Sequence, residues 1–420
     1  MILHKIRWVK LKNKVNIKNI LNFIEDRKLI EEGYLLFILI GMFFLTRQLV
    51  FPHASTLALV SIITSFIAAV IPIYKNFSRF EKKEKILFIG YFIFMTLILA
   101  YSLFIVKNKP YYAIHTYATC VLLIMAYIYP KNKKIVDIFI WIMIIHALVL
   151  IFIEIYMILN YTPEFASRVR NYIIGNGFGD IYTRNGIYFR AILRGNELLL
   201  IPYMILWRDK GVSARIKRIV LLLGIIVSGN MAYFISLAIF YLLNMILIDK
   251  NYKVIKIMLV ACTVIFIIFN KPIISKVDYT FQLKMEKSFP TRIDQVNVLI
   301  DDMENVTDVI LGKGMGNTLN AVTKYRNYTG DRYFELQSIY FYNQLGLIGF
   351  SIFVFLHLFL TYKFIKNRFS LIIYFCYLTY AVTNPYIFNL THLIIILVLT
   401  SMDNSLNNKD TYIKLDCENK

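Results

Sequence analysis

Five arginines gather between residues 160 and 195 of this chain. They are Arg168, Arg170, Arg184, Arg190 and Arg194. No lysine lies among them, although lysine outnumbers arginine over the whole sequence. A guanidinium is planar, always charged and able to grip a phosphate through two parallel N–H bonds. We therefore expect this group to bind an anion, with a diphosphate as the best fit. The alternatives are ion pairs with Glu164, Asp180 and Glu197, or contacts with lipid phosphates.

Two of these arginines, Arg190 and Arg194, stand four residues apart at the start of an apolar run. On a helix this spacing puts both on one face, and Glu197 would lie on much the same face. All three would then lie near a membrane interface, at the depth of a lipid-linked phosphate.

A second polar stretch runs from residue 270 to residue 337, between two apolar spans. Arg292 precedes a segment, 293–309, whose apolar residues recur at helical spacing, which predicts an amphipathic helix in the membrane interface. Three glycines follow at Gly312, Gly314 and Gly316. They permit tight turns or close approach of another backbone. Because they follow no predicted strand, we reject a nucleotide-binding site.

The end of this stretch mixes aromatic residues with arginine and closes on a carboxylate. We assign Arg326 and Arg332 to diphosphate binding, and Tyr325, Tyr328 and Tyr333 to stacking on sugar faces. The same composition also suits lipid headgroups. Glu335 stands directly before an apolar span, where partial burial would make its carboxylate a useful general base. The alternatives for Glu335 are an ion pair with Arg332 or a cap on the helix that follows.

Four histidines lie in or near apolar spans, each expected to be alone. They are His115, His146, His357 and His392. His146 and Glu154 stand eight residues apart on one face of one span, which favours packing contacts over a proton relay. The cysteines show no disulfide or metal-binding spacing, and we expect no metal and no cofactor.

The chain is strongly apolar and basic. Hydrophobic residues make up 58% and charged residues 17% of its 420 residues, and the mean hydropathy is +0.59. Many apolar runs reach the roughly 18 residues that span a bilayer. The fold class is therefore an all-α polytopic membrane protein, because a β-barrel would show short alternating segments. The net charge of +21 fits basic residues that hold cytoplasmic loops, so we expect no nucleic-acid partner.

The distribution of basic clusters predicts about 12 transmembrane helices with both termini cytoplasmic. The expected spans are 34–51, 57–74, 86–106, 112–129, 135–159, 191–207, two within 219–248, 254–269, 338–361, 369–384 and 386–401. The run 219–248 is interpreted as a hairpin broken at Ser228-Gly229-Asn230, although a single span is the alternative.

These spans divide the chain into seven regions. They are a cytoplasmic basic arm (1–33), N-terminal transmembrane helices (34–159), a first outer loop (160–190), central transmembrane helices (191–269), a large outer catalytic loop (270–337), C-terminal transmembrane helices (338–401) and a cytoplasmic tail (402–420).

Four features of the second half resemble the O-antigen polymerase and O-antigen ligase superfamily of membrane glycosyltransferases, which have the GT-C architecture. They are Arg292 before an amphipathic segment, the Gly312–Gly316 stretch, the polar residues Glu335–Ser338, and Gly346 with Gly349 in the next span. The polymerase pattern of Arg, ten residues and Gly fits Arg184 to Gly195 and Arg168 to Gly179. Glu335 stands where the ligase motif has a histidine, so a polymerase is favoured over a ligase.

The resemblance implies metal-independent, inverting transfer between undecaprenyl-diphosphate-linked oligosaccharides at the outer face of the bacterial plasma membrane. Glu335 and Arg292 would be the catalytic residues, and the arginines would neutralise the diphosphate. The product would be O-antigen, capsule or exopolysaccharide. A chain-length regulator and a flippase are implied as partners, beside the lipid bilayer. Alternative functions are an O-antigen ligase, a flippase or transporter for lipid-linked oligosaccharides, and a non-catalytic scaffold.

Overall fold

The structure is a computed structural model that describes residues 77–78, 80–129, 131–176, 178–183, 189–250, 289–330, 334–381, 384, 386–389 and 391–403. Several predictions lie outside these residues. They concern the arm 1–33, the spans 34–51, 57–74 and 254–269, the tail after residue 403, and the site residues Arg184, Arg332 and Tyr333.

Within the described ranges, five helices are long and apolar enough to cross a membrane. They are α4 (Lys82–Ala100) with its π-helical end η1 (Tyr101–Ile105), α5 (Pro110–Ile128), α6 (Lys133–Leu159), α10 (Met231–Asn244) with η4 (Met245–Asp249), and α14 (Gln337–Phe364). Many of their large apolar side chains are exposed, which suits contact with lipid. The chain is thus mostly helical and fits the class of α-helical membrane protein, whereas about 12 spans and the GT-C architecture stay predictions.

The apolar run 219–248 is broken where the sequence predicts. α9 (Val212–Ser228) ends at Gly229, whose φ of 59° lies in the left-handed region. Asn230 then caps α10, because its side chain accepts a hydrogen bond from the backbone N–H of Ala232 at 3.1 Å. α9 packs mainly against α6, whereas α10 packs mainly against α15 (Arg368–Ala381). The two helices of this run therefore pack against different elements.

The expected loop 160–190 and span 191–207 fold differently from the prediction. α7 (Pro163–Gly175) follows α6, and β1 (Gly179–Thr183) pairs antiparallel with β2 (Phe189–Leu193). Alternate residues of β2 are buried, a period of two that marks a strand. The prediction of a transmembrane helix over 191–207 is therefore wrong. Three short elements complete the segment: η2 (Asn196–Leu198), α8 (Leu200–Ile205) and η3 (Leu206–Arg208).

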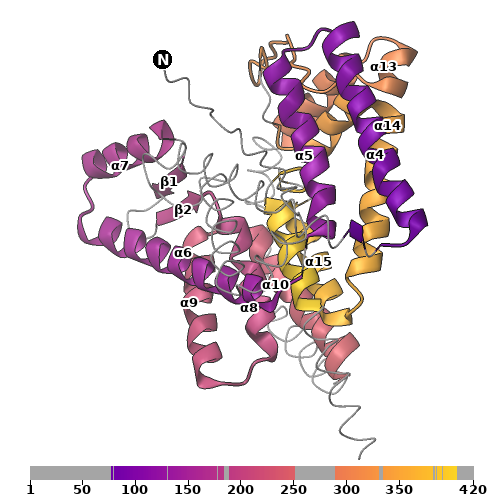
Figure 1. The fold of residues 1–420 in the computed structure, drawn as a ribbon. Coiled ribbons are helices and arrows are strands. Elements are labelled where there is room, and N and C mark those ends of the chain that lie inside the picture. Colours follow the sequence, from indigo (N-terminus) through magenta and orange to yellow (C-terminus); the bar gives the residue numbers. More distant parts are fainter. Residues whose placement is uncertain are drawn as a thin grey trace, which may run out of the picture.

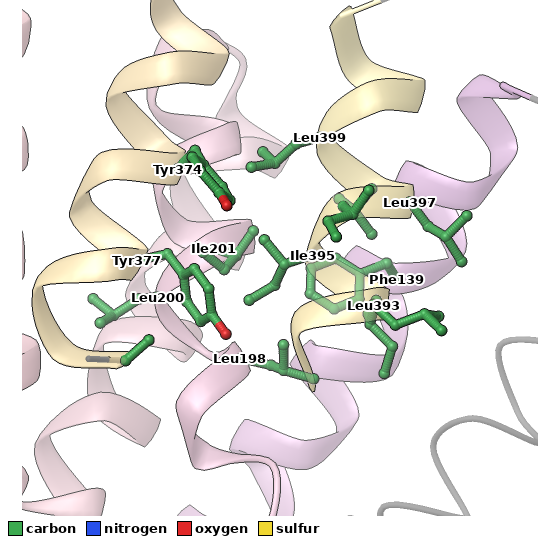
Figure 2. Packing of buried hydrophobic residues seen from close by; sticks show 14 of the residues in the cluster. Phe139, Leu198, Leu200, Ile201, Tyr374, Tyr377, Leu393, Ile395, Leu397 and Leu399 are labelled. Carbon is green, nitrogen blue, oxygen red and sulfur yellow. The ribbon is translucent and has the colours of Figure 1, made fainter. Parts of the chain in front are cut away.

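The last two expected spans, 369–384 and 386–401, are short helices. α15 has 14 residues, and the final helix, Thr391–Asp403, is also too short to cross a bilayer alone. Every residue of this final helix is buried, as is typical of a mostly apolar helix packed inside a protein. Figure 2 shows its side chains packed against Tyr374 and Tyr377 of α15.

The long polar stretch folds at one end of α4, α5 and α14 (Figure 1). Its described part starts with a helix at 289–301 and continues with α13 (Val306–Leu311), which contacts α14. The single helix expected over 293–309 is therefore split at 302–305, and its apolar residues Ile293 and Ile300 are exposed. A small core joins the stretch to the start of α14. Its buried members are Leu299, Leu319, Tyr328, Phe334 and Tyr340.

Gly224 sets the distance between α9 and α6. A Cβ at this position would lie 2.8 Å from Cβ of Ala147, closer than packed side chains come. Gly224→Ala is expected to cost about 1–3 kcal/mol through overpacking, which thermal unfolding of the purified protein measures. Gly90→Ala is the matched control, because a Cβ there meets nothing within 4 Å. This control should keep or raise Tm, and an equal loss in both variants would contradict the close contact of α6 and α9.

Candidate functional site

The two predicted catalytic residues meet in the structure. Arg292, on the helix at 289–301, donates from Nε to Oε2 of Glu335 at 2.8 Å. The two side chains remain 32% and 38% exposed, so a substrate group can reach both. Glu335 does not cap α14, because the N-cap residue is Leu336 and no side chain caps the helix. The contact joins a cation and a carboxylate that stand 43 residues apart in the sequence.

Local packing fixes the position of Glu335. The preceding residue, Phe334, is fully buried and stacks on Tyr328, with ring centroids 5.8 Å apart. The backbone N–H of Glu335 donates to Oε1 of Gln295 at 3.1 Å, and Gln295 lies three residues after Arg292 on the same helix. Gln295 is buried, and its Nε2 has no hydrogen-bond partner in the part of the chain that the structure describes. The helix at 289–301 thus places both members of the ion pair.

The glycine-rich segment docks onto the connection between α4 and α5. Its three glycines have φ angles of 82° (Gly312), 80° (Gly314) and 78° (Gly316). The backbone N–H of Met315 donates to Oγ of Ser102 at 2.7 Å, and Asn108 Nδ2 donates to the Met315 carbonyl at 3.1 Å. A Cβ on Gly316 would overlap the backbone of α5. The predicted close approach of another backbone is confirmed.

A polar cluster that the sequence analysis missed ties this segment to α14. Asn317 Nδ2 donates to Asp302 Oδ2 at 2.8 Å and to Asn343 Oδ1 at 3.0 Å, and Asn343 Nδ2 donates to the same Asp302 oxygen at 3.0 Å. The neighbouring Gln344 accepts through Oε1 from the backbone N–H of Gly316 at 2.7 Å. The sequence signal for this cluster was the adjacent pair Asn343-Gln344 inside an apolar span. Burial of an amide side chain there costs free energy unless the amide is hydrogen-bonded, so the pair indicates polar partners.

The aromatic residues near Glu335 differ in exposure. Tyr325 is 45% exposed, and Lys324 Nζ lies 4.8 Å from the centroid of its ring. Tyr328 is fully buried, and its hydroxyl donates to Asp294 Oδ2 at 2.9 Å. Tyr328 is therefore a core residue, and the prediction that its ring stacks on a sugar is wrong. The guanidinium of Arg326 lies 5.6 Å from the centroid of the Tyr328 ring.

The described arginines of the first group lie on α7 and on or beside β2. Arg170 donates to both carboxylate oxygens of Asp180, at 2.8 Å from Nε and 3.0 Å from Nη2, so the ion-pair alternative is confirmed for this residue. Arg168 lines an open surface pocket on α7. Arg190 donates from Nη1 to the hydroxyl of Tyr182 at 2.7 Å. Arg168, Arg190 and the exposed Arg194 beside β2 therefore remain candidates for an anion.

Arg190 and Arg194 share a side of a strand and not of a helix. Arg190 lies in β2 and Arg194 follows its last residue, so the even spacing keeps both on one side. Glu197 does not join them there, because it is buried. Its Oε2 accepts from the backbone N–H of Gly195 at 2.9 Å, and its Oε1 accepts from Thr391 Oγ1 at 3.0 Å. The expected helical face of these three residues is wrong.

The two groups of arginines lie apart. Figure 1 places α7, β1 and β2 on the left of the molecule and α13 with the ends of α4 and α5 on the right. The structure therefore brings Arg292 to Glu335, with Arg326 in the same polar stretch, and keeps Arg168, Arg170, Arg190 and Arg194 elsewhere.

One of the histidines makes a packing contact with a neighbouring segment, and two others contact each other. His146 Nε2 lies 3.0 Å from Oδ1 of Asn196, and Glu154 Oε1 accepts from the backbone N–H of Phe189 at 2.9 Å. Both hold the segment around β2 against α6, which confirms the packing alternative. His357 and His392 were expected to be alone. That prediction is wrong, because their Nε2 atoms are 2.7 Å apart.

Comparison with protein-family models, with curated proteins and with solved structures finds no match for this chain.

Proposed function

We propose that this protein is a polysaccharide polymerase of the bacterial plasma membrane. It would join undecaprenyl-diphosphate-linked repeat units at the outer face, with both termini in the cytoplasm. The contact between Arg292 and Glu335 supports the proposal most directly, because it puts a candidate base beside a candidate phosphate-binding cation in one accessible place. The resemblance to the polymerases includes the same two residues among its four features and supplies the reaction class.

The proposed reaction is a direct displacement at the anomeric carbon of the donor. An acceptor hydroxyl attacks that carbon and forms the new glycosidic bond, while its proton passes to the carboxylate of Glu335. The bond between the anomeric carbon and the diphosphate breaks, and its electron pair leaves with undecaprenyl diphosphate. Arg292 would exchange its contact with Glu335 for the diphosphate and stabilise the developing charge. A single displacement inverts the anomeric configuration.

Two separate groups of arginines suit two lipid-linked substrates. Donor and acceptor both carry a diphosphate, but only the bond to the donor diphosphate breaks. The acceptor hydroxyl lies at the other end of its repeat unit, so its diphosphate binds at a distance from the reacting carbon. We assign Arg292 and Arg326 to the leaving diphosphate, and Arg168, Arg190 and Arg194 to the acceptor diphosphate. Tyr325 offers an exposed ring to the glycan.

A flippase or other carrier for lipid-linked oligosaccharides is the second candidate. A carrier needs titratable groups inside its helical bundle. His357, His392, Glu154 and Glu197 are buried, and this observation favours the carrier over a scaffold. An O-antigen ligase ranks below both, because Glu335 replaces the histidine of the ligase motif.

Deletion of the gene in its own host tests the polymerase proposal. Cells without the protein should carry single repeat units, and the full chain should restore the ladder of polymer lengths on a glycan gel. Lipid-linked repeat units that accumulate on the cytoplasmic face would contradict the polymerase and identify a flippase. Full-length polymer that stays on the lipid carrier would contradict it in favour of a ligase.

A further inference from the structure

His357 of α14 and His392 of the final helix meet in the buried core. Their Nε2 atoms are 2.7 Å apart, and both side chains are buried. Two imidazole nitrogens at this distance need one hydrogen between them, because two lone pairs or two N–H groups would repel each other. The contact therefore has a defined donor and a defined acceptor.

A neighbouring hydroxyl decides which ring donates. Tyr377 of α15 donates its single hydroxyl hydrogen to the carbonyl of Tyr386 at 2.9 Å. Its contact with His392 Nδ1, at 3.2 Å, therefore requires that Nδ1 carry a hydrogen. His392 Nε2 is then the acceptor, and His357 Nε2 donates to it. In the neutral pair this leaves a lone pair on His357 Nδ1, and the hydroxyl of Tyr127 lies beside the ring, 3.4 Å from Nδ1 and 3.3 Å from Nε2.

The described side chains that face the pair are uncharged hydroxyls. α5 contributes Tyr127, which also contacts Thr361 of α14 at 2.6 Å. α15 contributes Tyr374, whose hydroxyl lies 3.2 Å from His357 Nε2, and Tyr377. Figure 2 shows both α15 tyrosines pointing toward the final helix.

Two charged residues form hydrogen bonds with residues that neighbour the histidine pair. Lys131 donates to the backbone carbonyl of Tyr127 at 2.9 Å, and the carboxylate of Glu197 accepts from Thr391, which precedes His392 in the final helix. Lys131 and Glu197 bond to Tyr127 and Thr391 and not to an imidazole, so among the described residues hydroxyl groups and the second ring are what stabilise any charge on the pair.

We propose that His357 and His392 together bind one proton in the core of the helical bundle. A proton from bulk water adds to the lone pair on Nδ1 of His357. The hydrogen on His357 Nε2 can then cross to His392, so either ring carries the charge and one N–H···N bond persists. A second proton would leave two N–H groups facing each other on two charged rings, which repulsion prevents. The site is separate from Arg292 and Glu335, so its failure would leave the polymerase proposal intact.

Nitrogen-15 NMR of the wild-type chain in lipid nanodiscs, labelled at histidine, tests the pairing. We expect a scalar coupling across the N–H···N bond between the two Nε2 atoms. We also expect the two residues to titrate together as the pH is lowered from 8 to about 3. His357→Gln and His392→Gln assign the signals. A wild-type protein without the coupling, or with two separate titrations, overturns the proposal.

Proton uptake between the same pH values measures the number of protons. The double variant His357→Gln/His392→Gln should take up one proton fewer per chain than the wild type. His115→Gln is the matched control, because His115 is exposed on α5 and removal of a single imidazole removes at most one proton site. A deficit of two protons in the double variant, or of none, overturns a shared one-proton site.

Discussion

Glu335→Gln is expected to lower polymer formation by about 10²–10⁴-fold, the range that a positioned general base contributes. The amide has nearly the shape of the carboxylate, and its oxygen can still accept from Arg292 Nε, but it cannot take the proton of the acceptor hydroxyl. The Arg292–Glu335 pair is one-third exposed, so its loss should change the stability by only about 0–1 kcal/mol. Polymer length on a glycan gel and the thermal unfolding of the purified variant measure the two effects separately.

Glu84→Gln is the matched control for this variant. Glu84 also pairs with a basic residue, Lys363, but it lies in the first turn of α4. Ser102, which binds the glycine-rich segment, lies at the opposite end of that helix, roughly 27 Å away at 1.5 Å per residue. The control should make polymer at the wild-type rate. A wild-type ladder from Glu335→Gln would contradict the role of Glu335 as base.

Local signals predicted much of the helical framework. The end of α6 at Leu159 agrees with the expected span 135–159, and Gly229 with Asn230 breaks the run 219–248 as expected. These features depend on a few neighbouring residues, because a left-handed glycine or a capping amide acts within one turn. The strand at 189–193 escaped prediction because its period of two covers only five residues inside a long apolar run.

The partners of the site residues depend on contacts that are distant in the sequence. The structure pairs Glu335 with Arg292, 43 residues away in the sequence, whereas the alternative partner Arg332 lies outside the described residues. Periodicity says which face of a helix a residue occupies, but it does not identify the element packed there. For the same reason the burial of Tyr328 and the meeting of His357 with His392 could not be predicted from spacing.

Gly346→Ala is expected to destabilise the protein by about 2–6 kcal/mol and to remove its polymer ladder. Gly346 interrupts α14 with φ 64° and ψ −178°, a conformation that costs a residue with a side chain about 1–3 kcal/mol. A Cβ there would also overlap the backbone of Gly312 and Ile310, which adds about 1–3 kcal/mol of overpacking. Gly312 meets Gly346 in the same way, because its own Cβ would overlap the Gly346 backbone. The contact therefore requires glycine on both sides.

Gly330→Ala is the control that separates the cost of backbone strain at a positive φ from the cost of the close contact between Gly346 and Gly312. Gly330 has a similar φ of 75°, but a Cβ there meets nothing within 4 Å, so this variant should lose only about 1–2 kcal/mol. Thermal unfolding compares the two variants, and equal losses would contradict the packing of Gly346 on Gly312. A larger loss in Gly346→Ala should come with loss of polymer, because Lys313 N–H donates to the Asn343 carbonyl at 2.8 Å across the same junction. Opening that junction would release the glycine-rich segment from the helix whose start carries Glu335.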